Sequence, residues 1–308
     1  MTKDIEIIDA HHHFWDLNQN YYPFLSDKID LDFFLGNYES IRKNYLPIDY
    51  IKDSKNHNII GTVHCEAEWN REDQVGETKW LEKLSKINKY PNAIVSHAWF
   101  HKKNAEAIIA EQASFDIVKG IRSKPSIRFS RNAKEYNKEG SMQDPNWRAG
   151  LKLLEKYNLN YDLRVPCWHL EEASEIVRLI PNTKVIINHA GFPWDRSKEG
   201  MEFWRKGIKA ISLEPNTFIK LSEFGVNGQD WNYYENANII YELIDLFGPY
   251  RCMFASNFPV SGLKITFDNL FKNYKKIVEN FSIDEKKALF SETAIKTYNI
   301  QQNMLNKK

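Results

Sequence analysis

Short apolar runs alternate along the chain with longer segments in which apolar residues recur at helical spacing. The runs occupy residues 5–8, 59–65, 93–98, 117–121, 159–165, 185–187, 218–221 and 252–255. Apolar runs of strand length separated by helical patterns are typical of βα units and a parallel sheet. A closed (β/α)₈ barrel contains eight such units. The pattern therefore predicts an α/β protein with a single TIM barrel.

The same pattern indicates the domain organisation. The 308 residues show no linker, so we expect one domain, residues 1–308, with loop insertions at the C-terminal face of the barrel. Residues 14–50 are rich in Asp, Asn and Tyr, and we expect them to form an insertion over the barrel mouth. A last helix is predicted to begin after Ser282, because Glu285 three residues later completes a capping box.

The composition argues against several classes of protein. The formal net charge is +1, from 42 basic and 41 acidic residues, so neither nucleic acid nor a membrane surface is an expected partner. No apolar run approaches the roughly 20 residues that span a bilayer, and the first residues form no apolar signal segment. The three scattered cysteines are expected to be reduced thiols. We therefore expect a cytoplasmic protein that acts on a small molecule. The oligomeric state stays open, a homo-oligomer included.

Histidines stand where two of the predicted strands end. His11 and His13 follow the first run two residues apart, so they share one face of an extended segment. Two imidazoles on one face can hold a divalent cation or a substrate oxyanion. His189 follows the sixth run directly. A surface histidine cluster, a tag remnant and a simple strand cap are the alternatives, but a tag carries more histidines and does not follow a buried strand. We therefore interpret all three as site residues.

Asn257 and two arginines occupy comparable positions. Asn257 stands between the eighth run and Pro259, as either a site residue or a turn residue. Arg122 follows the fourth run, and Arg128 lies further along the same loop. A guanidinium matches the planar fork of a carboxylate, so the two arginines indicate an acidic substrate. Solvent-facing loop charge is an explanation of equal weight.

Other polar residues at the strand ends have both a functional and a structural interpretation. Glu66, Asp162, Trp168 and His169 are candidates to bind the substrate or to activate water. An internal salt bridge or a rim contact is the equal or better explanation for them and for His64, Glu68, Arg164, Lys220, Ser222 and Glu223. The histidines expected to be structural, exposed or solvated are His97, His101 and His57.

An ordered set of stretches resembles one enzyme superfamily. The stretches are IDAHHHFWD at 8–16, GTVHCEAE at 61–68, GIR at 120–122, YDL at 161–163, NHAG at 188–191, KLS at 220–222 and MFASNFPV at 253–260. They resemble the amidohydrolase superfamily, and within it the branch of barrel hydrolases that includes sugar lactonases and 2-pyrone-4,6-dicarboxylate lactonase. The set spans nearly the whole chain in the right order. It is therefore specific for the fold and the superfamily, and much less specific for the substrate.

The resemblance implies roles for four residues. His11, His13 and His189 would be the site histidines and the candidate ligands of a divalent ion such as zinc. Position 257 corresponds to a strand-eight aspartate that serves as general base and metal ligand. Asparagine cannot accept a proton near neutral pH and is a weaker ligand than a carboxylate. We therefore expect weak metal binding or a metal-free site, and no organic cofactor.

The leading hypothesis is the hydrolysis of a small polar, carboxylated lactone or related cyclic ester. His11, His13 and His189 would polarise the carbonyl group, directly or through a divalent ion. Arg122 and Arg128 would hold the carboxylate of an anionic substrate.

The base that activates water has several candidates, because Asn257 can only orient water or substrate through its amide. His169, Glu66 and Asp162 are the residues considered for this role. A decarboxylase or other lyase on the same barrel is an alternative function. A barrel that binds a ligand without catalysis is another.

Overall fold

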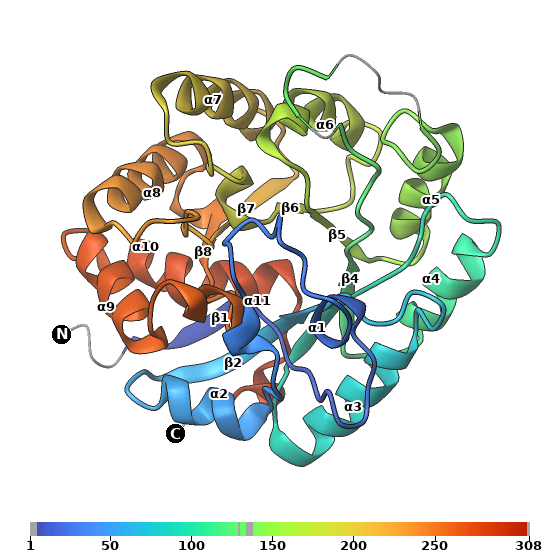
Figure 1. Cartoon of the computed structure of the whole chain (residues 1–308), viewed down its shortest axis with the longest axis horizontal. Helices are drawn as coiled ribbons and strands as arrows, with labels where there is room; N and C mark the ends of the chain where they lie inside the picture. Colours follow the sequence, from blue (N-terminus) through green and yellow to red (C-terminus); the bar gives the residue numbers. More distant parts are fainter. Residues whose placement is uncertain (1–4, 129, 134–137, 307–308) are drawn as a thin grey trace.

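Eight parallel strands form the centre of the protein in a computed structural model that describes residues 5–128, 130–133 and 138–306. The strands are β1 (Ile7–His12), β2 (Ile59–Cys65), β3 (Ala93–Ser96), β4 (Val118–Ile121), β5 (Asn160–Leu163), β6 (Val185–Ile187), β7 (Thr217–Leu221) and β8 (Cys252–Phe254). Each strand pairs with the next in chain order. Figure 1 shows the strands as a ring inside a layer of helices. The predicted α/β barrel is confirmed.

Helices follow the strands and cover the outside of the barrel. They are α2 (Pro47–Ser54), α3 (Gly76–Asn88), α4 (Ala105–Ala113), α5 (Pro145–Lys156), α6 (Leu170–Val177), α7 (Lys198–Ser212), α8 (Tyr233–Phe247) and α9 (Phe267–Ile277). On α7, for example, Trp204, Ile208 and Ile211 share the buried face, which is the helical spacing that the sequence shows. None of the described helices combines the length and the apolar character that a membrane-spanning helix needs.

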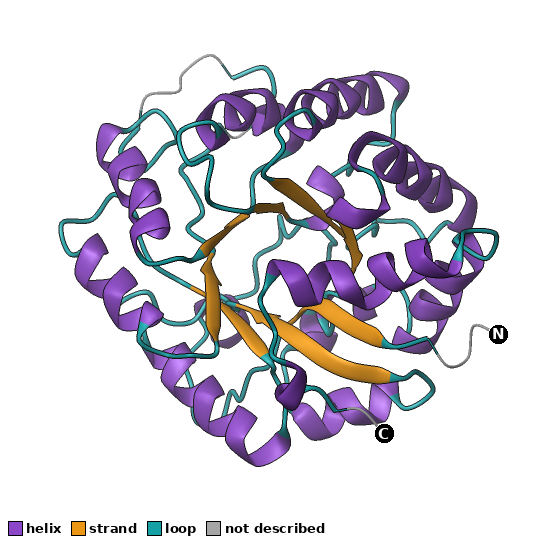
Figure 2. Cartoon of the chain, turned by 180° about the vertical axis from the view of Figure 1, so that it is seen from behind, coloured by secondary structure: helices purple, strands orange, loops and turns teal. Residues whose placement is uncertain are grey.

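A C-terminal helical segment closes one end of the barrel. It consists of α10 (Ile283–Lys287), a π-helical turn (Ala288–Glu292) and α11 (Thr293–Thr297), and it lies across the barrel in the view from behind (Figure 2). The predicted capping box is present. The Ser282 hydroxyl accepts a hydrogen bond from the Glu285 N–H, and the Glu285 carboxylate accepts one from the Ser282 N–H.

Strand β1 is longer than the apolar run that predicts it. The run ends at Ile8, whereas the strand continues to His12 with all of its residues buried. The carboxylate of Asp9 interrupts the apolar pattern, but it accepts hydrogen bonds from the Ser256 N–H at 2.8 Å and from the Tyr50 hydroxyl at 2.9 Å. These bonds compensate the buried charge, so the strand carries His11 inside the barrel.

Backbone hydrogen bonds close the seam between β8 and β1. They involve His11, His13 and Asn257, whose side chains are candidate site groups. The Asn257 N–H donates to the His11 carbonyl oxygen at 2.7 Å, and the His13 N–H donates to the Phe258 carbonyl oxygen at 2.8 Å. The seam therefore fixes the first and last strands relative to each other.

Residues 14–50 cross the mouth of the barrel, and we call them the lid segment. The segment contains α1 (Pro23–Ser26), the 3₁₀ turn Glu39–Ile41 and the start of α2. In Figure 1 its dark-blue trace passes over the opening of the strand ring. Trp15 and Tyr45 exchange backbone hydrogen bonds of 3.0 Å, which draw the two ends of the segment together.

Candidate active site

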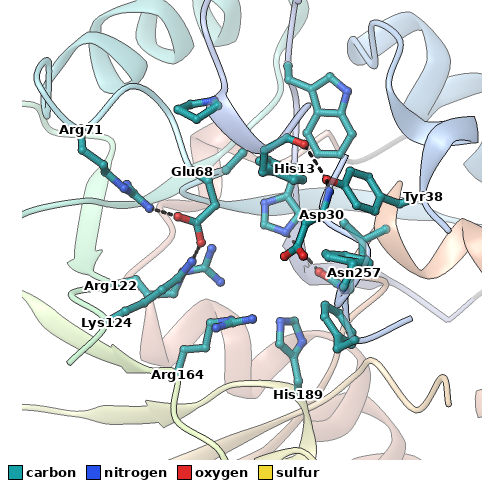
Figure 3. A pocket seen from close by; sticks show the side chains of 17 residues that line it. His13, Asp30, Tyr38, Glu68, Arg71, Arg122, Lys124, Arg164, His189 and Asn257 are labelled. Carbon is teal, nitrogen blue, oxygen red and sulfur yellow. Dashed lines mark hydrogen bonds and ion pairs between the residues drawn. The ribbon is translucent and has the colours of Figure 1, made fainter. Parts of the chain in front are cut away.

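A cavity of about 340 Å³ lies between the lid segment and the C-terminal ends of the strands. His13, His189 and Asn257 line it together with four basic side chains and a group of aromatic side chains. Figure 3 shows the two histidines and the asparagine facing the same space. Catalytic residues of TIM-barrel enzymes gather at this face of the barrel. The cavity is therefore the candidate active site.

Three histidines gather at the bottom of the cavity: His11 at the end of β1, His13 just after that strand, and His189 after β6. His13 and His189 line the cavity, whereas His11 is fully buried and is not part of its lining. The ring centre of His11 lies 5.0 Å from that of His13 and 4.5 Å from that of His189. Burial lowers the pKa of all three imidazoles well below its usual value, and the charge of Arg122 adds to this effect at each of them. The floor therefore carries three neutral imidazoles near pH 7.

Hydrogen bonds determine which nitrogen of His13 carries the proton. Nδ1 lies 2.7 Å from the carbonyl oxygen of Cys65, which can only accept, so Nδ1 is the protonated nitrogen. Nε2 then presents a lone pair, 3.1 Å from Oδ1 of Asn257. The amide keeps this orientation because its Nδ2 donates to the carboxylate of Glu223. The floor thus presents two acceptors side by side.

A buried ion pair lies below the histidines. The ammonium of Lys220 is 2.5 Å from Oδ1 of Asp162 and 3.3 Å from Nδ1 of His11. Asp162 also accepts hydrogen bonds from the Asn188 amide at 2.9 Å and from the Tyr298 hydroxyl at 3.1 Å. Both buried charges are therefore compensated within the barrel, as such a pair requires.

Arg122 lines the cavity, but protein groups engage its guanidinium. Nε donates to Oε1 of Glu66 at 2.7 Å, Nη1 donates to Oδ1 of Asn188 at 3.3 Å, and Nη2 donates to the Glu66 carbonyl oxygen. Arg71 and Lys124 approach the same carboxylate, at 2.9 and 3.4 Å. Burial opposes ionisation of Glu66, but the three cations hold its pKa well below its usual range. The Glu66 carboxylate is therefore occupied by protein cations, and Glu66 is not among the residues that line the cavity.

One wall of the cavity carries the basic side chains of Arg71, Arg122, Lys124 and Arg164. Among the described residues, Arg164 has no carboxylate partner. Its guanidinium carbon lies 5.3 Å from the centre of the Phe192 ring. Burial, together with the charge of Arg122, lowers the pKa of Arg164 to about 10. In Figure 3 its guanidinium points into the cavity between Lys124 and His189. A cation held this way provides a binding site for an anion.

The opposite wall is aromatic and comes from the lid segment. It is formed by Trp15, Phe24, Phe33, Phe34 and Tyr38. The rings of Phe33 and Tyr38 are in contact, with centres 4.6 Å apart, and the Tyr38 hydroxyl donates to the Phe24 carbonyl oxygen at 3.0 Å. An apolar wall opposite a cationic wall suits a ligand with a flat apolar face and an anionic group.

Several residues considered from the sequence lie outside the cavity lining. Nε2 of His169 accepts from the Arg128 N–H at 2.9 Å, and its Nδ1 lies 3.0 Å from the Glu172 carboxylate. The Arg128 side chain donates to the Trp168 carbonyl oxygen at 2.8 Å, and the Trp168 indole donates to the Arg128 carbonyl oxygen at 3.1 Å. These bonds tie the loop after β4 to the loop after β5. Asp162 lies below the floor, bound to Lys220.

Other residues that line the cavity were not predicted from the sequence. Arg71 comes from the loop after β2 and follows no strand end, so no local signal indicated it. The lid aromatics were expected only as part of a covering segment. Lys220 was considered from the sequence for an internal salt bridge, and the structure places it outside the cavity lining in such a bridge with Asp162.

The donors near His11 do not fit a tightly held divalent ion, although groups that can ligate a metal gather there. One atom each of His11, Cys65 and Asp162 lie within 4.8 Å of one another, all buried. Asp162 already binds the Lys220 ammonium. Burial raises the pKa of the Cys65 thiol to about 12, so the thiol is protonated while no metal is bound. On the cavity side, Asn257 offers a neutral amide instead of a carboxylate.

The effect of an aspartate at position 257 depends on Glu223. In Asn257→Asp alone, the new aspartate would face the carboxylate of Glu223, which now accepts a hydrogen bond from the Asn257 amide. Two carboxylates so close together share one proton, so the pair carries a single negative charge. We expect this single variant to leave zinc affinity nearly unchanged. Asn257→Asp with Glu223→Gln is expected to raise it about tenfold, or about 1.4 kcal/mol, because the charge then stands at the floor. Calorimetric zinc titrations of the two tag-free variants measure their affinities. Equal zinc affinities for the single and the double variant would contradict the role of Glu223.

Comparisons with known proteins agree with this architecture. A family profile described as amidohydrolase matches residues 8–300. Protein y4mH of Sinorhizobium fredii is 37% identical over 97% of this chain and 100% of its own length. L-fucono-1,5-lactonase of Burkholderia multivorans is 22% identical over 94% of this chain and 95% of its own length.

A solved structure shows the same fold. A crystal structure of an amidohydrolase from Burkholderia multivorans with bound HEPES covers 96% of this chain and 99% of its own, with a TM-score of 0.80 and 21% identity. A second crystal form of that protein, with bound zinc, has a TM-score of 0.77 at 20% identity and the same coverage. The match of the profile over nearly the whole chain establishes that this protein belongs to the amidohydrolase family.

Proposed function

We propose that this protein hydrolyses a small carboxylated lactone whose ring has a flat apolar face. The kinship with L-fucono-1,5-lactonase supports the lactone class. The observation that carries the proposal is the arrangement of the floor, where Nε2 of His13 and Oδ1 of Asn257 lie 3.1 Å apart and the guanidinium of Arg164 faces the same cavity. The two acceptors serve the reaction, and the guanidinium serves recognition.

The paired acceptors would hold the attacking water. A water that donates one hydrogen to His13 and the other to Asn257 turns its lone pairs toward the cavity. Its oxygen forms a bond to the lactone carbonyl carbon while its proton passes to Nε2 of His13. The ring C–O bond then breaks, and His13 returns the proton to the departing alkoxide. The product is the open-chain hydroxy acid.

The two walls would orient the substrate. A carboxylate on the ring would pair with Arg164, because Arg122 is already engaged by Glu66 and Asn188. The flat face of the ring would lie against the aromatic side chains of the lid segment. This orientation would direct the ring carbonyl toward the histidines at the floor.

A substrate panel tests the proposal. Acid release is followed with neutral sugar lactones and with carboxylated flat lactones, and released carbon dioxide is measured in parallel. We expect kcat/KM for the carboxylated lactones to be higher by about tenfold or more, because a charged hydrogen bond contributes ~1.5–3 kcal/mol. A preference for neutral sugar lactones contradicts the anionic substrate. Carbon dioxide release without acid formation identifies a decarboxylase instead, and binding without turnover identifies a ligand-binding barrel.

The charge of Lys124 is expected to set an upper pH limit to anion binding, because this lysine pairs with Glu66 and Glu68 and its deprotonation would leave their negative charge less compensated at the cavity. Burial, helped by the charge of Arg164 and opposed by Glu66, lowers the pKa of this lysine to about 8. The ammonium is charged below that pH and loses its charge above it. We expect the affinity for the open-chain carboxylate product to fall between about pH 7 and about pH 9, and Lys124→Arg to abolish this fall, because a guanidinium stays charged. Calorimetric titration at several pH values measures it. A flat profile in the native protein contradicts this role.

A further inference from the structure

Lys220 makes an unusual set of contacts at the centre of the barrel. Its ammonium touches Oδ1 of Asp162 at 2.5 Å and Nδ1 of His11 at 3.3 Å, and it lies 5.2 Å from the centre of the Tyr298 ring. Asp162 and His11 are two of the three residues, with Cys65, whose ligand atoms lie within 4.8 Å of one another. The ammonium therefore binds the same groups that a metal ion would bind.

We propose that the Lys220 ammonium takes the place of a divalent cation in this barrel and thereby fixes His11 as a hydrogen-bond donor. An ammonium has only hydrogens to offer, so the His11 nitrogen that faces it must present a lone pair. The ring is neutral, and its single proton then resides on Nε2. No metal is needed to set this state.

Nε2 of His11 is the donor that would meet a substrate oxygen, although His11 is fully buried and does not itself line the cavity. It lies on the far side of the ring from Lys220, is buried, and has no hydrogen-bond partner among the described residues. An N–H in this state is an unsatisfied donor, which costs free energy until an acceptor arrives. The carbonyl oxygen of a lactone gains negative charge as water adds, and it would accept this hydrogen bond more strongly in the transition state than before it.

His11, in β1, and His13, just after it, therefore carry opposite roles. His13 is fixed by the Cys65 carbonyl oxygen with its lone pair on Nε2, and His11 is fixed by Lys220 with its proton on Nε2. One is an acceptor and the other a donor, although the residues stand two positions apart in the same segment. The donor role toward a lactone rests on the proposed function, whereas the replacement of a metal by Lys220 does not.

Lys220→Met tests the replacement without reference to activity. The variant removes the ammonium and frees His11, Cys65 and Asp162 for a metal. We expect zinc affinity to rise by about tenfold or more over the native protein, since an anionic oxygen and a sulfur ligand become available. With cobalt, the variant should show the absorption band of a thiolate-bound ion, and the native protein should not. Lys220→Met with Cys65→Ser is the matched control, and it should lose the band.

Nitrogen NMR of the histidine rings gives the second readout. In the native protein we expect the proton of His11 on Nε2, and in Lys220→Met a mixture of the two tautomers. If Lys220→Met does not fold, Lys220→Met with Asp162→Asn removes both charges together and retains this readout.

Two results would overturn the inference: a native protein that binds one zinc ion with a Kd of about 1 μM or tighter, or a His11 whose proton resides on Nδ1. A failure of the proposed function would look different: the zinc, cobalt and NMR results would be as expected, but no lactone would be hydrolysed.

Discussion

His13→Gln is expected to lower kcat for lactone hydrolysis by about a thousandfold, because a positioned general base contributes ~10²–10⁴-fold. Glutamine can still donate to the Cys65 carbonyl oxygen, which His13 reaches at 2.7 Å, but its amide has no basic lone pair. The substrate contacts with the walls are unchanged, so KM is expected to change little. Initial rates of acid release over a range of substrate concentrations separate the two constants.

His101→Gln is the matched control for this substitution. His101 lies outside the cavity lining, beside Glu139 at 3.7 Å, so the same change of residue type should leave kcat near its native value. Thermal unfolding of both variants shows whether the fold is intact. A His13→Gln protein that folds and retains more than about a tenth of native kcat contradicts the assignment of His13 as the base.

Arg164→Met should lower kcat/KM for a carboxylated lactone by about a hundredfold, or ~2.7 kcal/mol, the range of a charged hydrogen bond to a planar carboxylate. Methionine preserves most of the apolar stem, so the contact with the Phe192 ring is retained in part. The kcat/KM of Arg164→Lys should lie between those of the native protein and Arg164→Met, because lysine keeps the positive charge but cannot form the paired hydrogen bonds of a guanidinium. The loss should appear mainly in KM.

A neutral substrate provides the control for charge. The methyl ester of the same lactone should react with native and Arg164→Met protein at similar kcat/KM, because it has no carboxylate to pair. Arg205→Met, on the exposed face of α7 beside Glu242, controls for the loss of one basic residue. Equal losses on acid and ester would show that Arg164 supports the fold of the cavity and does not recognise an anion.

The sequence predicted the barrel because the signals for it are local. Each strand is a short apolar run and each helix shows its own spacing, so eight units can be counted without knowledge of any contact between them. The same applies to His11, His13, His189 and Asn257. In parallel barrels every strand ends at the same face, so the rule that strand ends converge places these side chains near one another.

Pairing between distant residues could not be predicted in this way. The sequence favoured Arg122 and Arg128 as the carboxylate-binding cations and gave Arg164 a structural role as the equal or better explanation. The structure shows instead that Glu66 engages Arg122 while Arg164 faces the cavity. Lys220 and Asp162 likewise come from different strands, and their contact depends on the register of the barrel. Such partners are decided by packing across the barrel, which leaves no trace in the local pattern.

The seam hydrogen bonds have a consequence for how this enzyme can change over evolution. The backbone of His13 and Asn257 closes the barrel, so these amides belong to its most cooperative unit and should be among the slowest to exchange with deuterium. The aromatic wall, in contrast, belongs to the lid segment, which lies outside that closure. Lid substitutions can therefore alter which ring is accepted without loosening the reactive floor. New specificities should arise in residues 14–50 far more readily than new chemistry arises at positions 13 and 257.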